Sequence, residues 1–169
     1  MKQYPTANCI IFLDIDGVIT SARTGWYDMD IFAVNYLIWL CKQANAQIVV
    51  SSTWRFNTSR EFWLTIFPDL IHDDWRTKTF RFEGREYNRG DEIAEWLHRH
   101  DYITEYAILD DDKDMLPEQL DRFIHTNSEN GLMFQDMIKL KDLLKVNGWW
   151  QKDFSPYISN NMFLESRQK

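Results

Sequence analysis

Residues 9–17 read CIIFLDIDG, an apolar run of five residues followed by two aspartates, one on each side of an isoleucine, and a glycine. The apolar residues follow one another without alternating with polar ones, a pattern typical of a strand that is buried on both faces. Strands of this kind belong to parallel sheets that helices cover on both sides. We therefore predict a parallel sheet, with Asp14 and Asp16 directly after one of its strands.

Three more short runs are predicted to be strands, the last of them the weakest: Gln47–Val50, Tyr106–Leu109 and Arg122–His125. Helical periodicity occupies the intervals between them, and four helices are predicted: Asp30–Ala44, a short one that a capping box at Thr58–Glu61 opens and that runs through Ile66, Asp91–His100 and Gln135–Val146. Strands that alternate with helices indicate an α/β fold, a doubly wound, Rossmann-like parallel sheet.

The composition is that of one globular domain. The chain has 169 residues, 44% of them hydrophobic and 27% charged, which excludes a disordered or fibrous protein. We assign residues 1–146 to the domain and residues 147–169 to an aromatic-rich C-terminal extension. The net charge of −7 argues against a sequence-independent grip on long duplex DNA.

The sequence also indicates a compartment. Two cysteines, Cys9 and Cys41, do not make a disulfide framework and suit a reducing environment. The first eight residues are polar, and the apolar run after them is too short for a secretory signal or a membrane span. We expect a cytoplasmic protein without a membrane partner.

Polar side chains follow each of the three stronger strands: Asp14 and Asp16, Ser51 and Ser52, Asp110 and Asp111. In an open α/β sheet these positions meet in the crevice beyond the carboxyl ends of the strands. Carboxylates that converge there repel one another unless a cation neutralises them, and Mg²⁺ is the cation that such oxygen ligands suit. Serine hydroxyls and backbone N–H groups in the same crevice are typical phosphate ligands.

Each motif alone has a simpler interpretation. Asp-x-Asp-Gly also occurs in surface turns and calcium loops, although the buried strand before it disfavours both. Ser51 and Ser52 alone are compatible with a mere cap on the following turn, and the acidic run after Leu109 with a solvated loop. The three motifs in this order carry much more information than any one of them.

Together the motifs resemble those of the haloacid dehalogenase (HAD) superfamily. Phe12–Val18 resembles its first motif, Val49–Ser52 its second and Ile108–Asp111 its fourth. More narrowly, four strings are similar to HAD domains associated with RNA-repair proteins: SSTWR (51–55), RGDEI (89–93), LDDD (109–112) and GL (131–132).

The resemblance implies roles for the aspartates. Asp14 would be the nucleophile that forms an aspartyl-phosphate, and Asp16 would protonate the leaving oxygen and then activate water. The magnesium site would comprise Asp14, Asp16, Asp110 and Asp111.

Ser51 and Ser52 of the second motif would bind the substrate phosphate. The family's third motif usually supplies a lysine, but this chain has Arg89 at the expected place. We assign that role to Arg89, with Lys78 as the alternative. Arg55, in the loop of the second motif, is a further candidate for the phosphate.

No segment looks long enough for a cap domain over the crevice. Residues 17–29 form only a short flap, and residues 54–88 are expected to hold one short helix and a loop, with His72–Asp74 in that loop. An open crevice suits the end of a large substrate, because a small metabolite usually needs a lid that excludes water. Aromatic and arginine side chains are expected around it and suit a nucleic acid: Arg23, Trp26 and Tyr27 in the flap, and Trp54 and Arg55 in the loop of the second motif.

The leading hypothesis is a Mg²⁺-dependent phosphomonoesterase that acts on RNA or DNA ends or on nucleotides. One alternative is a nucleotidase or small-metabolite phosphatase. Another is a non-catalytic HAD-like module that binds nucleic acid or a partner protein. The oligomeric state, the kind of nucleic acid and the position of the phosphate stay open.

Overall fold

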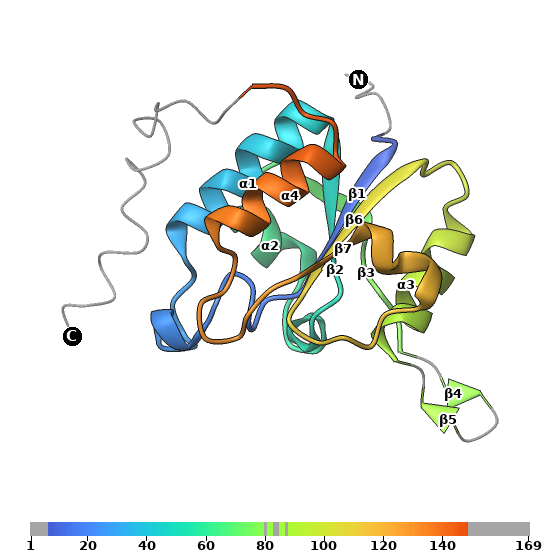
Figure 1. The fold of residues 1–169 in the computed structure, drawn as a ribbon. Helices are drawn as coiled ribbons and strands as arrows, with labels where there is room; N and C mark the ends of the chain where they lie inside the picture. The colour runs from blue at the N-terminus through green and yellow to red at the C-terminus, as the bar shows by residue number, and fades with distance from the viewer. Residues whose placement is uncertain (1–6, 80, 83–84, 87, 149–169) are drawn as a thin grey trace.

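Five parallel strands form the central sheet of the computed structural model, which describes residues 7–79, 81–82, 85–86 and 88–148 (Figure 1). The strands lie in the order β3-β2-β1-β6-β7. Their bounds are β1 Cys9–Leu13, β2 Ala46–Val50, β3 Ile71–Arg76, β6 Glu105–Asp110 and β7 Phe123–His125. The predicted doubly wound α/β fold is confirmed.

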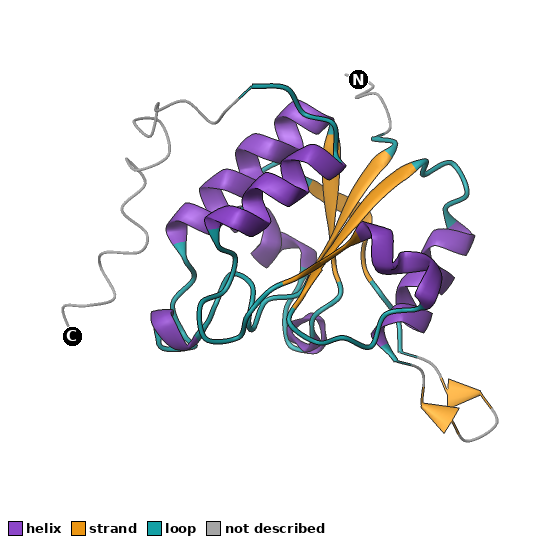
Figure 2. Ribbon diagram, viewed as in Figure 1, coloured by secondary structure: helices purple, strands orange, loops and turns teal. Residues whose placement is uncertain are grey.

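Helices cover both faces of this sheet (Figure 2). One face carries α1 (Ile31–Ala44), α2 (Arg60–Ile66) and α4 (Phe134–Leu143). The other carries α3 (Arg89–Arg99) and a 3₁₀ helix at Pro117–Arg122 that the sequence did not indicate. Two shorter 3₁₀ helices, Ala22–Thr24 and Thr53–Phe56, lie in the loops after β1 and β2.

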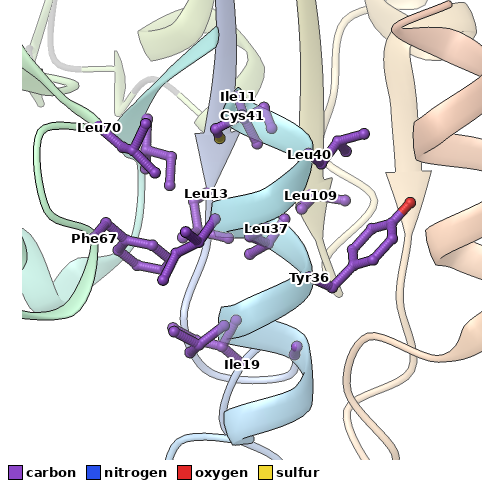
Figure 3. Packing of buried hydrophobic residues seen from close by; sticks show 14 of the residues in the cluster. Ile11, Leu13, Ile19, Tyr36, Leu37, Leu40, Cys41, Phe67, Leu70 and Leu109 are labelled. Carbon is purple, nitrogen blue, oxygen red and sulfur yellow. The ribbon is translucent and has the colours of Figure 1, made fainter. Parts of the chain in front are cut away.

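Alternate residues of β1 enter different cores, as the side-chain period of a strand requires. Ile11 and Leu13 pack with α1, and Figure 3 shows them beside Leu37 and Cys41 of that helix. Ile10 and Phe12 belong to the second cluster, together with residues of α3 such as Trp96. Burial of both faces explains why β1 has no polar residue.

The helix starts fix several loops near the carboxyl edge of the sheet. Asp30 caps α1 by accepting from the backbone N–H of Phe32 at 2.9 Å, and Ser59 caps α2 in the same way through Phe62. Asn88 caps α3, so that helix begins at Arg89, two residues earlier than predicted. Arg89 is therefore the first residue of a helix whose N-terminus points to the same edge.

The segment between β2 and α3 differs from the prediction. His72, Asp73 and Asp74 lie in β3, an edge strand paired with β2, and not in a loop. An edge strand has one neighbour and exposes much of its length. β3 therefore contains polar residues and lacks the continuous apolar run by which the central strands were predicted. A small hairpin of β4 (Arg81–Phe82) and β5 (Arg85–Glu86) follows.

The described part of the chain contains no cap domain. Between β2 and α3 it has only a 3₁₀ turn, the short helix α2, the edge strand β3 and the hairpin. This agrees with the expected capless architecture. The proposed extension lies outside the described residues apart from Asn147 and Gly148, so the domain boundary stays a prediction. Within the described ranges, no helix combines the length and apolarity needed to span a bilayer.

Candidate active site

The site lies where the chain reverses its direction of winding. The chain passes from β1 outward to β2 and β3, and then crosses back to β6 on the other side of β1. The loops after β1 and β6 therefore leave the sheet toward opposite sides and open a crevice between them. Asp14 follows β1 there, and Asp110 ends β6.

Three carboxylates meet in this crevice. One oxygen each from Asp14, Asp110 and Asp111 lies within 4.8 Å of the others. The backbone holds the group in place, because the N–H of Asp14 donates to the carbonyl of Leu109 at 2.9 Å. Gly17 is required beside it: its φ is +76°, and a Cβ at this position would lie 2.2 Å from Cγ of Asp111.

Burial and mutual repulsion make these carboxylates difficult to ionise. Burial raises the pKa of Asp110 to about 7, with a further rise from the Asp14 charge that Arg89 opposes. Burial also raises the pKa of Asp14, against the lowering effect of Arg89 and of a hydrogen bond from Ser52. The pKa of Asp111 is raised by burial and by Asp14. A hard divalent cation fits such a set of oxygen donors, because its charge removes the repulsion.

Arg89 is the cation that the structure places against the nucleophile candidate. Its Nη1 lies 3.2 Å from Oδ1 of Asp14 and 3.0 Å from Oδ2 of Asp110, and its side chain is only 14% exposed. The backbone N–H of Arg89 donates to Asp114 at 3.0 Å. Lys78 is exposed and contacts neither aspartate. The geometry thus favours Arg89 over Lys78 for the third-motif position.

Asp16 has different surroundings. Its Oδ1 accepts from the hydroxyl of Thr20 at 2.8 Å, and its Oδ2 accepts from Nε1 of Trp54 at 3.0 Å. Among the described residues, the acidic group with metal-ligand geometry does not include the Asp16 carboxylate. The predicted role of this side chain as a metal ligand stays a prediction. Both oxygens are instead held by neutral donors.

The two serines of the second motif lie at the end of β2. The N–H of Ser51 donates to the carbonyl of Leu13 at 3.0 Å, which ties this loop to β1. Its hydroxyl oxygen is buried and has no hydrogen-bond partner among the described residues. Ser52 is also buried, and its hydroxyl bonds to Asp14. A buried hydroxyl without a partner is an available ligand for a phosphate oxygen.

Arg55, which the sequence suggested as a phosphate ligand, is buried and bonded to other groups of the protein. Its Nη2 forms a buried ion pair with Glu92 of α3 at 2.9 Å and a hydrogen bond to Thr79, while Nη1 donates to the carbonyl of Ser51. The Arg55 side chain is 3% exposed, and that of Glu92 is 6% exposed. These contacts make Arg55 a brace of the loop, while its Nε is buried without a hydrogen-bond partner among the described residues. Its predicted contact with phosphate stays a prediction.

Sequence reasoning missed Glu92 and Thr20. Glu92 carried a usable signal, because it lies one helical turn before Trp96 and thus on the apolar face of α3. An acidic residue on such a face needs a buried cation as its partner. Thr20 carried none, since its contact with Asp16 depends on the turn after β1.

Of the flap residues that were expected at the rim, Trp26 and Tyr27 are exposed, at 41% and 92%. Arg23 pairs with Asp30 and donates to the carbonyl of Asn130, so its side chain ties the flap to the start of α1 and to the loop after β7.

Comparison with known proteins identifies a family. A family model described as the HAD domain in Swiss Army Knife RNA repair proteins matches residues 10–137. This range includes all the aspartates and serines of the crevice as well as Arg89. No curated protein and no solved structure matches the chain.

Proposed function

The chain belongs to the family of HAD domains in Swiss Army Knife RNA repair proteins, and from this premise we propose a Mg²⁺-dependent phosphomonoesterase that acts on phosphorylated nucleic-acid ends. The family supports a phosphatase-like hydrolase. The metal, the aspartyl-phosphate and the substrate are parts of the proposal.

One observation carries the reaction type. Two carboxylates only two residues apart have opposite surroundings: Asp14 lies in the acidic group against Arg89, whereas Asp16 lies outside it between Thr20 and Trp54. Two carboxylates with different environments are suited to different tasks. Here these are attack on phosphorus and transfer of a proton.

The residues then perform two displacements. An oxygen of Asp14 attacks the phosphorus, the bond to the leaving oxygen breaks, and Asp16 gives that oxygen a proton. Asp16 next takes a proton from a water molecule, which attacks the phosphorus of the aspartyl-phosphate. Phosphate departs and Asp14 is restored. Arg89 and the Ser51 hydroxyl neutralise and orient the phosphoryl oxygens through both steps.

Asp14, Asp110 and Asp111 would hold the magnesium ion. When bound, Mg²⁺ shields the phosphoryl charge from the attacking carboxylate. The donor set supports this assignment, since it consists of carboxylates whose pKa values are raised by burial and, for Asp110 and Asp111, also by the Asp14 charge. Arg89 contacts two of the same carboxylates, Asp14 and Asp110.

The test is phosphate release with Mg²⁺ from oligonucleotides phosphorylated at the 3′ or the 5′ end, and from the matching mononucleotides. We expect release from an oligonucleotide by the wild-type protein and none by Asp14→Asn. Asp14→Asn keeps the size of the side chain, and its melting temperature controls for folding. An active Asp14→Asn variant would contradict the mechanism. Preference for the mononucleotide would make the protein a nucleotidase. The net charge of −7 favours a mononucleotide as substrate, because it repels a polyanion more strongly.

A further inference from the structure

A cavity of about 350 Å³ opens beside Asp16. The loop between β2 and α2 supplies the rest of its lining, which consists of Thr53, Trp54, Phe56, Asn57 and Thr58. The acidic group of the crevice does not line it. The cavity therefore adjoins the residue to which the proposed function gives the proton of the leaving group, and Asp14 is not among its lining residues.

This placement determines which part of a substrate enters. Asp14 attacks phosphorus on the side opposite the leaving oxygen, because the displacement is in line. Asp16 must lie within hydrogen-bond reach of that oxygen. Whatever is attached to the leaving oxygen next to Asp16 is then the group that this cavity receives.

The lining suits a flat, uncharged ring. Phe56 is 57% exposed, and the guanidinium of Arg55 lies 4.4 Å from its ring centroid. Because Glu92 fixes Arg55, this contact holds the Phe56 ring in place. Trp54 is fixed by its bond to Asp16 and by packing against Trp63 at 6.2 Å between ring centroids.

The polar groups of the cavity fit the edges of such a ring. Thr58 is occupied, since it donates to the carbonyl of Trp54 and accepts from Nε1 of Trp63. Asn57 is exposed, and its side-chain amide bonds to no described residue, so it offers both a donor and an acceptor. No basic side chain lines the cavity, which makes it unsuited to a second phosphate.

We propose that this cavity binds the nucleobase of the terminal nucleotide, stacked on Phe56, while the phosphate of that nucleotide lies in the crevice. The proposal rests on the proposed function, because the leaving group defines the direction of the cavity. Aromatic rings stack on any base. The cavity therefore favours a terminal nucleotide that carries a base over an abasic one, and it accepts different bases.

The test measures binding separately from turnover. The probe is an end-phosphorylated oligonucleotide with a dye at its far end, compared with the same oligonucleotide whose terminal residue lacks its base. Dissociation constants are measured by fluorescence anisotropy on Asp14→Asn. The wild-type protein in a chelator serves as a second non-hydrolysing sample. We expect the abasic end to bind ~10-fold more weakly.

Two variants locate the effect. In Phe56→Leu the difference between the two probes should shrink toward none, since an apolar side chain remains but its aromatic face is lost. Tyr102→Leu is the matched control, because Tyr102 is an aromatic residue of similar exposure, 43%. It lies in the loop before β6, at the amino end of that strand, whereas the crevice lies at the carboxyl end. The Tyr102→Leu variant should keep the full difference.

Equal dissociation constants for the two probes, or no binding of either, would overturn the proposal. So would a Phe56→Leu variant that discriminates as well as Tyr102→Leu does. The proposed function fails by a different result: wild-type protein that binds the probes but releases no phosphate with Mg²⁺.

Discussion

Asp16 accepts hydrogen bonds on both carboxylate oxygens, and only one of the two donors is able to reverse its role. The hydroxyl of Thr20 lies within reach of both Asp16 and the carbonyl of Ile15, at 2.8 and 3.2 Å. It donates to Asp16 when that group is ionised, and it accepts from Asp16 while donating to Ile15 when the group is protonated. The indole of Trp54 donates in either state and fixes the orientation of the carboxyl group.

Trp54→Phe tests this orientation. It removes the donor and keeps an aromatic ring, so we expect kcat to fall by ~10-fold on glycerol 2-phosphate, with little change in KM. The loss should be smaller on p-nitrophenyl phosphate, because that leaving group needs less protonation. Steady-state kinetics on both substrates check this. Trp39→Phe in α1 is the control, and an equal loss on both substrates would contradict a role in proton transfer.

Arg89 contacts two carboxylates at once, which a lysine ammonium achieves less well than a guanidinium. We expect Arg89→Ala to lower kcat/KM by ~100-fold and Arg89→Lys to retain a larger part of it. Lys78→Ala should have full activity. If Lys78→Ala lost activity and Arg89→Ala did not, the third-motif role would belong to Lys78.

At the scale of elements, the buried pair of Arg55 and Glu92 joins the loop after β2 to helix α3. The same helix carries Arg89 at its first residue, and the same loop carries Ser52 and Trp54. One ion pair thus links the loop that carries Ser52 and Trp54 to the helix that carries Arg89. It also supports the Phe56 ring through Arg55.

Breaking this pair should destabilise the fold. Glu92→Ala leaves a buried guanidinium without its partner, and we expect a loss of about 3 kcal/mol in the free energy of unfolding. The double variant Arg55→Met/Glu92→Leu should lose less than the sum of the single variants. Chemical denaturation of the wild type, Glu92→Ala, the single variants Arg55→Met and Glu92→Leu, and the double variant measures both quantities. Asp73→Ala is the control, since it removes an exposed pair with Arg60 and should cost less than ~0.5 kcal/mol.

The central strands could be predicted clearly from the sequence, whereas of the two edge strands β7 was predicted only weakly and β3 was missed. β1, β2 and β6 are central, so their apolar runs and the polar residues that follow them predicted both the sheet and the group of Asp14, Asp110 and Asp111. β3 lies at the edge, and its polar residues concealed it. The contacts of Arg55 and Asp16 depend on how loops pack, which no local pattern indicates.

For the whole molecule, the acidic group of Asp14, Asp110 and Asp111 makes the free energy of unfolding depend on pH and on a bound cation. Folding raises the pKa of Asp110 from 3.8 to about 7, so the folded protein binds a proton that the unfolded chain has released. Without a metal ion, the contribution of this group to the free energy of unfolding is therefore present at low pH and is lost as the pH rises through about 7. A bound cation requires the ionised carboxylate and reverses this loss.

The stabilisation by Mg²⁺ should accordingly grow with pH. We expect saturating Mg²⁺ to raise the melting temperature by about 5 °C or more near pH 8 and by much less near pH 5. Melting curves with and without Mg²⁺ at each pH isolate the effect, because all other groups are common to both samples. Asp110→Asn should remove it. An equal shift at both pH values would show that the ion binds elsewhere.

The central claim is that Asp14 carries the phosphoryl group, and trapping that group tests it most directly. In Asp16→Asn, p-nitrophenyl phosphate still supplies a leaving group that departs without a proton, but water is no longer activated. With Mg²⁺ we predict a burst of nitrophenolate equal to the enzyme present, and acid-quenched peptides that carry one phosphoryl group on Asp14. A burst that survives in the Asp14→Asn/Asp16→Asn double variant, or a phosphoryl group on another residue, would contradict the account.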